Sequence, residues 1–457
     1  MIINLVILNK LSTMGCNIYK PNYENLSSQT EESPILIPKT NKVIHVSLTK
    51  SMTTQNKDSD LQHVLQNCND LAYSKQYDQN IEEMKASYSE VLTKMKYSIA
   101  GLKNIGNTCF LNTAIKCLVS NTPFVLLFNS IASCLNSEYK SYLQELIGMF
   151  KGILIGGTFS PSLFKKQLGL LDPTFNGLNQ NDCFQALISI LDNAHKGIKL
   201  DPTKHSISFP TEACGKDSNN EYLFGYIRKC IKILETHTSL VYDMFLNMCV
   251  NQYECLKCEA KQIKFDINTG LPLDISKMSD LNECIKSYYK TELYSDYKCR
   301  SCGEKVDIKV TRVPIFFAPI VILQLKRFKM DFSTMKEVKD NTVIRYPIMN
   351  SALSLKQFVP KYVIKEFYGG GLRRRYNLDY YLTGAGIHSG SLNGGHYYSH
   401  IYNCTKNEWE CHNDSYVHSL NVDEAQNNGA ITLTFMRKDM FEYKQTNADY
   451  IIANIFS

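Results

Sequence analysis

The chain has 457 residues, of which 44% are hydrophobic and 21% are charged, with a formal net charge of +6. This length accommodates one large multi-lobed domain and an extension. Its sixteen cysteines are irregularly spaced, which argues against a secreted disulfide framework, and its mild positive charge is too dispersed for a nucleic-acid-binding surface. These features favour an intracellular protein, cytoplasmic or nuclear.

Residues 1–99 are predicted to form an N-terminal extension. Residues 1–75 are rich in Asn, Ser, Thr and Lys and lack a sustained periodicity, so we expect them to be flexible. Residues 80–97 carry apolar side chains at helical spacing and predict an amphipathic helix that leads into the core. The apolar start at residues 1–8 lacks a basic segment and a small-residue cleavage site, so we expect no signal peptide.

A cysteine stands where a glycine-broken polar loop meets a predicted helix. The turn signal ends at Cys109, and apolar residues follow at Leu111, Ala114, Ile115 and Leu118, which is helical spacing. A thiol at a helix N-terminus lies at the positive end of the helix dipole, which favours the thiolate. Cys109 is therefore a candidate nucleophile, although a cysteine followed by Phe and Leu is, taken alone, usually a small core residue.

The middle of the chain predicts helices followed by an insertion. Residues 101–195 read as mostly helical. Residues 196–238 contain Asp201-Pro202 and a polar run at 215–220, and we interpret them as an insertion with one helix near 222–234.

Two Cys-x-x-Cys pairs then follow, separated by forty residues: Cys255 with Cys258, and Cys299 with Cys302. Four thiolates from two such pairs suit tetrahedral Zn²⁺, and a closed set of four cysteines is typical of a structural site. The separation exceeds that of a single zinc ribbon, and two long β excursions joined at their tips would explain it. A metal-free, reduced tip is the alternative. A redox pair is disfavoured because neither pair lies in a βαβ setting.

From Val306 onward, alternating Val, Ile, Leu and Tyr predict a sheet that closes with Ile431, Leu433 and Phe435. The longest apolar run, Val313 to Leu325, is too short to cross a membrane and contains two prolines. We therefore interpret it as a buried strand of that sheet.

Among ten histidines, His396 has the most informative context. Gly394 and Gly395 precede it and would let an extended chain pass close to the imidazole. A hairpin centred near residues 404 and 405 would place His396 opposite Asn413, whose side-chain oxygen could orient the ring. A histidine on a strand and an Asn-Asp turn are each usually structural. Together with Cys109, they favour a Cys-His-Asn triad.

These motifs, taken in order, resemble those of the ubiquitin-specific proteases. The segment Gly101–Leu118 resembles the family's Cys box, and Gly394–Tyr402 with Trp409–Val417 resembles its His box. Three intervening stretches also resemble family segments in family order: Ser239–Phe245, Leu271–Asp274 and Leu323–Phe328. The resemblance spans residues 100 to about 438, roughly three quarters of the chain.

The resemblance implies an α+β fold, a papain-like cysteine peptidase with a helical thumb, a β-sheet palm and β fingers that carry the four-cysteine zinc site. It implies a catalytic domain over 100–440, with fingers at about 241–330, the insertion at about 196–238 and a tail at 441–457. It also implies cleavage after the C-terminal Gly-Gly of ubiquitin without a catalytic cofactor. The expected partners are ubiquitin and ubiquitinated proteins, without nucleic acid or membrane, for a monomeric enzyme.

Site roles follow from positions in the matching motifs. The resemblance implies that Cys109 is the nucleophile, that His396 is the general base and acid, and that Asn413 orients the ring. Asp414 is the adjacent acidic position that assists. Asn104, five residues before the nucleophile, matches the side chain of the oxyanion hole.

The chain departs from the family after the Cys box. The family usually has Gln-Gln-Asp-Ala, a variable residue and then Glu-Phe, whereas Gln180–Ala186 retains Asp182 but has Gln185 at the acidic position. The change removes a charge that could pair with an arginine of the ubiquitin tail. We expect the substrate tail to be bound by Asp182, Gln185, Gly394, Gly395 and Tyr397. Two alternatives stay open: a protease for another ubiquitin-like modifier, and a non-catalytic ubiquitin-binding scaffold.

Overall fold

The structure, a computed structural model, describes residues 99–125, 128, 138–199, 207–214, 220–331, 335–348, 351–368, 378–391 and 394–446. The predicted flexible segment 1–75, the predicted helix at 80–97 and residues 447–457 of the predicted tail lie outside these ranges. Within these ranges, no helix combines the length and the apolar character needed to span a membrane. The twelve cysteines whose side chains the structure describes form no disulfide.

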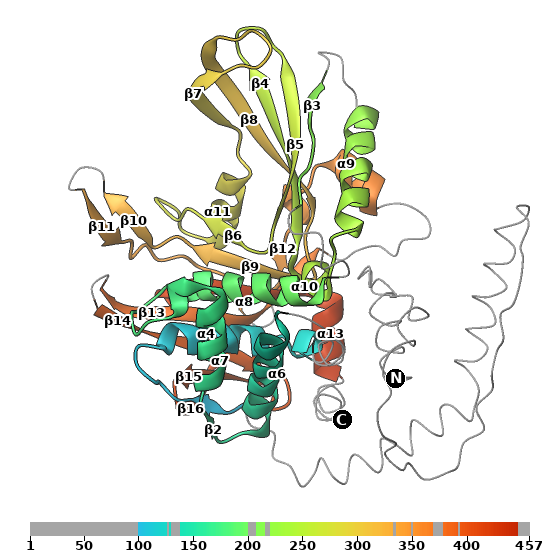
Figure 1. The fold of residues 1–457 in the computed structure, drawn as a ribbon. Coiled ribbons are helices and arrows are strands. Elements are labelled where there is room, and N and C mark those ends of the chain that lie inside the picture. Colours follow the sequence, from blue (N-terminus) through green and yellow to red (C-terminus); the bar gives the residue numbers. More distant parts are fainter. Residues whose placement is uncertain are drawn as a thin grey trace, which may run out of the picture. The chain divides into compact units, whose positions relative to one another are not determined.

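Helices dominate the described chain as far as Phe245 (Figure 1). They are α4 (Cys109–Val119), α6 (Lys140–Ile155), α7 (Ser162–Leu171), α8 (Cys183–Ile198), α9 (Asn220–Glu235) and α10 (Leu240–Phe245). The mostly helical prediction for 101–195 is confirmed, and α9 covers the helix predicted near 222–234. Two short strands, β1 (Gly101–Leu102) and β2 (Thr158–Phe159), pair in parallel beside them.

A large sheet, which we call the palm sheet, follows the helices in the second half of the described chain. Among the described residues its strands follow the order β16 (Tyr416–Leu420), β15 (Glu408–Asn413), β14 (Gly394–Asn403), β13 (Asp379–Ser391), β17 (Ala430–Arg437), β9 (Ile320–Leu325) and β6 (Leu271–Leu273). Strand β12 (Leu353–Ser354) pairs with β13. All eight residues of β17 are buried, as expected of a central strand, and the predicted closing strand at Ile431–Phe435 is confirmed.

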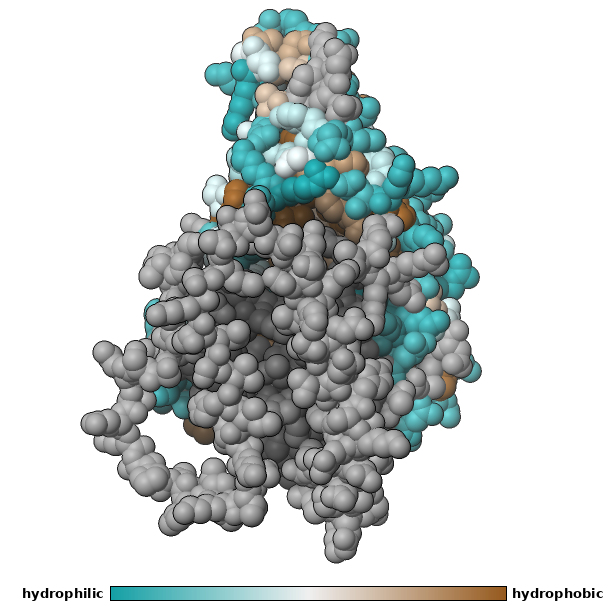
Figure 2. Space-filling model, turned by 90° about the vertical axis from the view of Figure 1, so that its right-hand side faces the viewer, coloured by the Kyte–Doolittle hydropathy of each residue, from teal (hydrophilic) through white to brown (hydrophobic). Residues whose placement is uncertain are grey.

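A second sheet, the finger sheet, projects from the palm sheet, and α9 lies along one side of it (Figure 1). Its described strands follow the order β3 (Thr211–Cys214), β5 (Lys261–Asn268), β4 (Asn247–Cys255), β8 (Lys305–Phe316) and β7 (Glu292–Lys298), all antiparallel. In Figure 2 the projecting end carries mostly hydrophilic residues with a few weakly hydrophobic ones. Such a surface is compatible with an element that extends into solvent.

The prediction of one buried strand from Val313 to Leu325 is wrong, because this segment contributes to two strands. Strand β8 ends at Phe316 in the finger sheet, and β9 begins at Ile320 in the palm sheet. Pro319 lies in the break, where a residue without a backbone N–H cannot continue a central ladder. The alternating residues from Val306 therefore belong first to the finger sheet and only later to the palm.

The remaining elements connect the two sheets or close the chain. A separate hairpin consists of β10 (Phe328–Asp331) and β11 (Lys336–Lys339). Helix α11 (Leu281–Tyr288) follows β6, and α13 (Lys438–Thr446) follows β17. Short helical turns occur at Pro173–Phe175, Lys356–Phe358, Lys361–Val363, Ile364–Tyr368 and Val422–Ala425.

Helix α4 is the centre of the core. All eleven of its residues are buried, and it packs against β13 and β14 on one side and α8 on another. Gly386 of β13 permits the close approach, since a Cβ there would lie 3.0 Å from Cγ2 of Thr113 on α4. The first residue of this helix, Cys109, is thereby held at the junction of the helices and the palm sheet.

Candidate active site

Cys109 lies at the start of α4, as the sequence predicts, and is 2% exposed. The loop before it contains Gly106 and Asn107, both with positive φ (109° and 52°), a conformation that glycine and asparagine tolerate best. The backbone N–H of Tyr397, the residue after His396, lies near the sulfur of Cys109 and lowers the pKa of its thiol. The fold therefore brings the predicted nucleophile to the predicted base, although 287 positions separate them in sequence (396 − 109).

The helix dipole does not make Cys109 a resting thiolate. Burial raises the pKa of the Cys109 thiol, and the negative charge of Asp414 raises it further. The backbone N–H groups of Tyr397, Phe110 and Cys109 lower it by less. The amides at the helix N-terminus act in the predicted direction, but desolvation outweighs them, so the net pKa is raised. Ionisation of this thiol requires a base.

His396, on β14, forms a hydrogen bond through Nε2 to Oδ1 of Asn413 at the end of β15, with a distance of 2.6 Å. Since Asn413 Oδ1 is an acceptor, Nε2 carries the proton and Nδ1 is the nitrogen left to accept one. The carboxylate of Asp414 lies 3.8 Å from the same Nε2. The ring is therefore oriented from one side by both predicted residues.

The hairpin register differs from the sequence prediction. Asn403 pairs with Glu408, so the centre lies between residues 405 and 406, and not between 404 and 405. A four-residue turn at 404–407, with Asn407 in the left-handed region at φ 56°, sets this register. The predicted pairing of His396 with Asn413 is thus two residues out of register. A two-residue slip keeps side chains on the same face of the sheet, which is why the hydrogen bond still forms.

Asp414 is the centre of a polar web around the site. Its Oδ2 accepts a hydrogen bond from Nδ2 of Asn104 at 3.0 Å, and its Oδ1 accepts one from Nδ2 of Asn112 at 2.7 Å. The Oδ1 of Asn104 in turn accepts from the backbone N–H groups of Gly106 (3.2 Å) and Thr108 (3.1 Å). These contacts fix the orientation of the Asn104 amide beside the Cys109 loop.

The sequence analysis missed Asn112. It lies one turn after Cys109 and is 3% exposed, in a helix that has no solvent-facing side. A buried amide must find a hydrogen-bond partner, and its partner is the His-box carboxylate of Asp414. No local signal singled it out, because Asn112, like Thr113 and Lys116, falls between the apolar positions, where an amphipathic helix usually carries its exposed side chains.

Gly394 and Gly395 lie at the start of β14, as predicted. A Cβ on Gly395 would lie 2.2 Å from Nε2 of the buried His388, so only glycine fits without displacement of that ring. The carbonyl of Gly395 accepts a hydrogen bond from Nε2 of Gln180, 3.1 Å away, on the loop before α8. This contact connects the helical half to the strand that carries His396, and the sequence analysis did not anticipate it.

Tyr397 is 5% exposed, so its ring is part of the core. Its hydroxyl oxygen accepts a hydrogen bond from the backbone N–H of Cys183 at the start of α8. Its ring centroid lies 4.7 Å from that of His388. The buried ring leaves only the backbone of Tyr397, which lies beside the Cys109 sulfur, for the predicted contact with substrate.

Asp182 and Gln185 lie at the N-terminus of α8. Asp182 is the N-cap, and its Oδ1 accepts the backbone N–H of Gln185 at 2.9 Å. Burial raises the pKa of Asp182, and the N–H groups of Gln185 and Phe184 partly offset this. Gln185 is exposed and lines a shallow hollow of about 360 Å³ with Phe184, Ile188 and Asp192. Asp182 therefore has a local structural role in addition to any contact with substrate.

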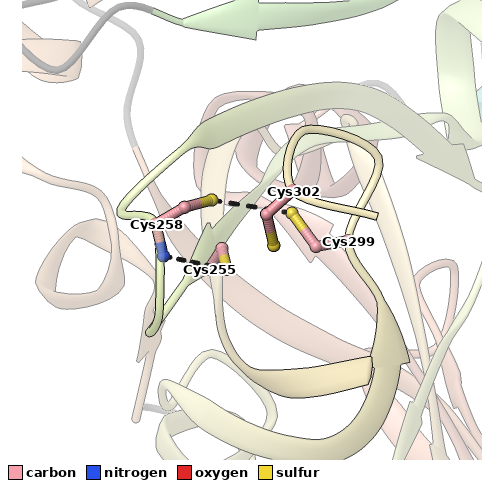
Figure 3. Close-up of side chains that lie close together, drawn as sticks. All are labelled: Cys255, Cys258, Cys299 and Cys302. Atoms are coloured by element: carbon pink, nitrogen blue, oxygen red, sulfur yellow. Dashed lines mark hydrogen bonds between the residues drawn. The ribbon is translucent and has the colours of Figure 1, made fainter. Parts of the chain in front are cut away.

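The four cysteines of the predicted zinc site converge at the end of the finger sheet (Figure 3). Their sulfur atoms all lie within 4.8 Å of one another, and Sγ of Cys258 is 3.8 Å from Sγ of Cys299. Zn–S bonds of about 2.3 Å in a tetrahedron require sulfur atoms about 3.8 Å apart. Backbone N–H groups of Cys258 and Ser301 donate to Sγ of Cys255 and Cys299, both at 3.4 Å. This donor set could hold a zinc ion.

The helices and the palm sheet meet at a buried cysteine and a histidine–asparagine pair. This arrangement is a papain-like α+β fold. The family model described as "Ubiquitin carboxyl-terminal hydrolase" matches residues 100–435. The chain therefore belongs to the ubiquitin carboxyl-terminal hydrolase family.

Individual relatives agree with this assignment. Ubiquitin carboxyl-terminal hydrolase 2 of Rattus norvegicus is 27% identical over 366 residues, which cover 75% of this chain and 54% of the relative. Ubiquitin carboxyl-terminal hydrolase 5 of Saccharomyces cerevisiae is 25% identical over 353 residues, which cover 69% of this chain and 42% of the relative. The chain thus spans about half the length of these curated relatives.

A solved structure shares the fold. It is the SAGA DUB module, Ubp8 with Sgf11, Sus1 and Sgf73, bound to monoubiquitin. The match has a TM-score of 0.57 and 21% sequence identity, and it covers 79% of this chain and 76% of that chain.

Proposed function

We propose that this chain is a deubiquitinating cysteine protease that hydrolyses the peptide or isopeptide bond after the C-terminal Gly-Gly of ubiquitin. The observation that carries the proposal is the arrangement around His396: its Nε2 is engaged by Asn413, while the backbone of the next residue contacts the sulfur of Cys109. Family membership and the ubiquitin bound in the related SAGA DUB module support ubiquitin as the substrate.

In the proposed reaction, Nδ1 of His396 removes the proton of the Cys109 thiol. This step is needed because burial keeps the thiol protonated at rest. The thiolate attacks the carbonyl carbon of the terminal glycine, and the imidazolium then protonates the departing lysine amine. Water activated by His396 hydrolyses the thioester and regenerates the thiol. Asn413 and Asp414 hold the ring in the required tautomer.

Asn104 is the proposed oxyanion donor. One N–H of its amide is engaged by Asp414, which leaves the second N–H for the oxygen of the tetrahedral intermediate. Its carbonyl is fixed by two backbone N–H groups, so the donor is oriented before substrate arrives. Loss of one such donor typically lowers the rate by about 10²–10³-fold.

We propose that Cys255, Cys258, Cys299 and Cys302 hold a structural Zn²⁺. The spacing of their sulfur atoms supports a closed four-thiolate site. When bound, the metal crosslinks the turn after β4 to the turn after β7. No reaction step involves it.

A monomeric enzyme of the cytoplasm or nucleus, with the domain boundaries given above, remains our prediction.

A panel of electrophilic probes tests the substrate assignment. Ubiquitin and several ubiquitin-like modifiers, each with a reactive group at the C-terminus, are incubated in parallel with the full chain. We expect the ubiquitin probe to label Cys109 at least about tenfold faster than the others, a difference of about 1.4 kcal/mol. Faster labelling by another modifier would reassign the substrate. Non-covalent ubiquitin binding without labelling would favour the scaffold alternative.

The departure at Gln185 gives a second prediction. Gln185→Glu should lower KM for a ubiquitin substrate by about three- to fivefold and leave kcat unchanged, because an exposed ion pair contributes up to about 1 kcal/mol. Steady-state kinetics at low and high salt measure the effect, which salt should weaken. Gln144→Glu, the same change at an exposed position of α6, is the control. An equal KM for both variants would show that this position does not contact the ubiquitin tail.

A further inference from the structure

Helix α4 carries two buried polar side chains on one face. Asn112 and Lys116 are four positions apart, so they lie on the same side of the helix, and they are 3% and 2% exposed. The Nζ of Lys116 donates to the backbone carbonyl of Ala100, in the segment that leads to the oxyanion loop. A lysine this deeply buried requires a compensating charge or acceptor nearby.

Strand β15, which packs against α4, carries two further buried titratable side chains. Glu410 and His412 alternate along β15, are 1% and 2% exposed, and lie two to four residues before Asp414. Glu410 Oε2 accepts from Nε2 of His412 at 3.1 Å, and Glu410 Oε1 accepts from Nζ of Lys406 at 2.6 Å. Asp414, two residues after His412, accepts the 2.7 Å hydrogen bond from Asn112 on α4.

Lys116 on α4 interacts electrostatically with Glu410 and His412 on β15. Burial lowers the pKa of Lys116 to about 7, and the Glu410 carboxylate opposes that shift. Burial would raise the pKa of Glu410, but hydrogen bonds from His412 and Lys406 lower it to about 2. Burial lowers the pKa of His412 to about 4, and Lys116 adds to the decrease. His412 is therefore neutral at pH 7, and Glu410 is the anion at the centre of the cluster.

We propose that Lys116, Glu410 and His412 are positioning residues. The cluster holds the end of β15, with Asn413 and Asp414, at a fixed register against α4, and so sets Cys109 relative to His396. The physical reason is that apolar packing between a helix and a strand tolerates sliding, whereas a buried charge set with defined partners stabilises one register. The inference builds on the proposed function, because it assigns how the same site is aligned.

The test is the pH dependence of Cys109 alkylation by iodoacetamide in the full chain, followed on the Cys109 peptide by mass spectrometry. Glu410→Gln is close in shape and removes the central charge. If the cluster positions the site, His396 is held less well and stabilises the thiolate less, so the midpoint moves to higher pH by at least about 0.5 units. Loss of a nearby negative charge without displacement would move it to lower pH. A lower or unchanged midpoint therefore overturns the proposal.

Three further variants control for charge and folding. Glu408→Gln changes the same residue type at a half-buried position of the same strand. It removes the 3.6 Å ion pair of Glu408 with Lys406 but leaves both bonds to Glu410 in place, so it should leave the midpoint unchanged. If Glu410→Gln does not fold, the surface variants Lys406→Met and Lys406→Arg decide, since only the first removes the bond to Glu410. We expect Lys406→Met to lower kcat about threefold with KM unchanged, and Lys406→Arg to retain the wild-type kcat. Equal kcat for the two variants overturns the proposal. Alkylation requires no ubiquitin, so failure of the proposed function would be seen separately, as a wild-type chain without ubiquitin turnover.

Discussion

Cys109→Ala is expected to abolish hydrolysis of a fluorogenic ubiquitin C-terminal amide, with a loss of at least about 10⁴-fold in kcat. In the proposed mechanism the sulfur of Cys109 forms the acyl-enzyme, so this variant lacks the nucleophile for that step. The site is otherwise preserved, since the side chain is small and buried and the web around Asp414 does not include the sulfur. Binding of ubiquitin, measured by calorimetry, should change by less than about threefold.

The control for this prediction is Cys117→Ala, two turns further along the same helix and equally buried. That variant creates a cavity of similar size but should retain turnover, at the cost of some stability. Turnover by Cys109→Ala above about one percent of the wild-type rate would contradict the assignment of the nucleophile.

Zinc removal has the second largest expected effect. We expect the purified chain to contain about one zinc ion, and Cys302→Ser to lose it. Structural zinc contributes about 10–16 kcal/mol of apparent binding energy in zinc-finger peptides, so its loss should release the tips of β4 and β7. Hydrogen exchange should rise in these strands while α4 and α8 stay protected. Elemental analysis and exchange mass spectrometry measure both outcomes.

The matched control is Cys249→Ala, on β4 of the same sheet but outside the four-cysteine cluster. This variant should retain zinc and the protection of β7. The rate of Cys109 alkylation should be unchanged by zinc removal, because the cluster lies at the far end of the fingers. If the purified chain contains no zinc and takes up none, the cysteines form a reduced, metal-free tip, which is the alternative that the spacing left open.

The elements most readily predicted from sequence are those with local determinants. The helix at Cys109 follows from the loop and the apolar spacing after it, and the closing strand at Ile431–Phe435 follows from strict alternation. The four-cysteine cluster follows from two short motifs whose chemistry has few other uses. The strand at Val313–Leu325 was mispredicted because a continuous apolar run does not show where the chain passes from one sheet to another.

Residue identity and short-range spacing alone identified the cysteine, the histidine, the asparagine and the two cysteine pairs, because each motif is read within a few positions. The tertiary structure decided the protonation of Cys109, the register at His396 and the partners of Asn112 and Glu410. The pKa of Cys109 and the bond of Asn112 to Asp414 depend on desolvation and on contacts between segments about 300 positions apart. The hairpin register and the partners of Glu410 lie close in sequence, but side-chain geometry and not residue type selects them. Burial and long-range pairing are set by the whole packed core, so no local pattern contains them.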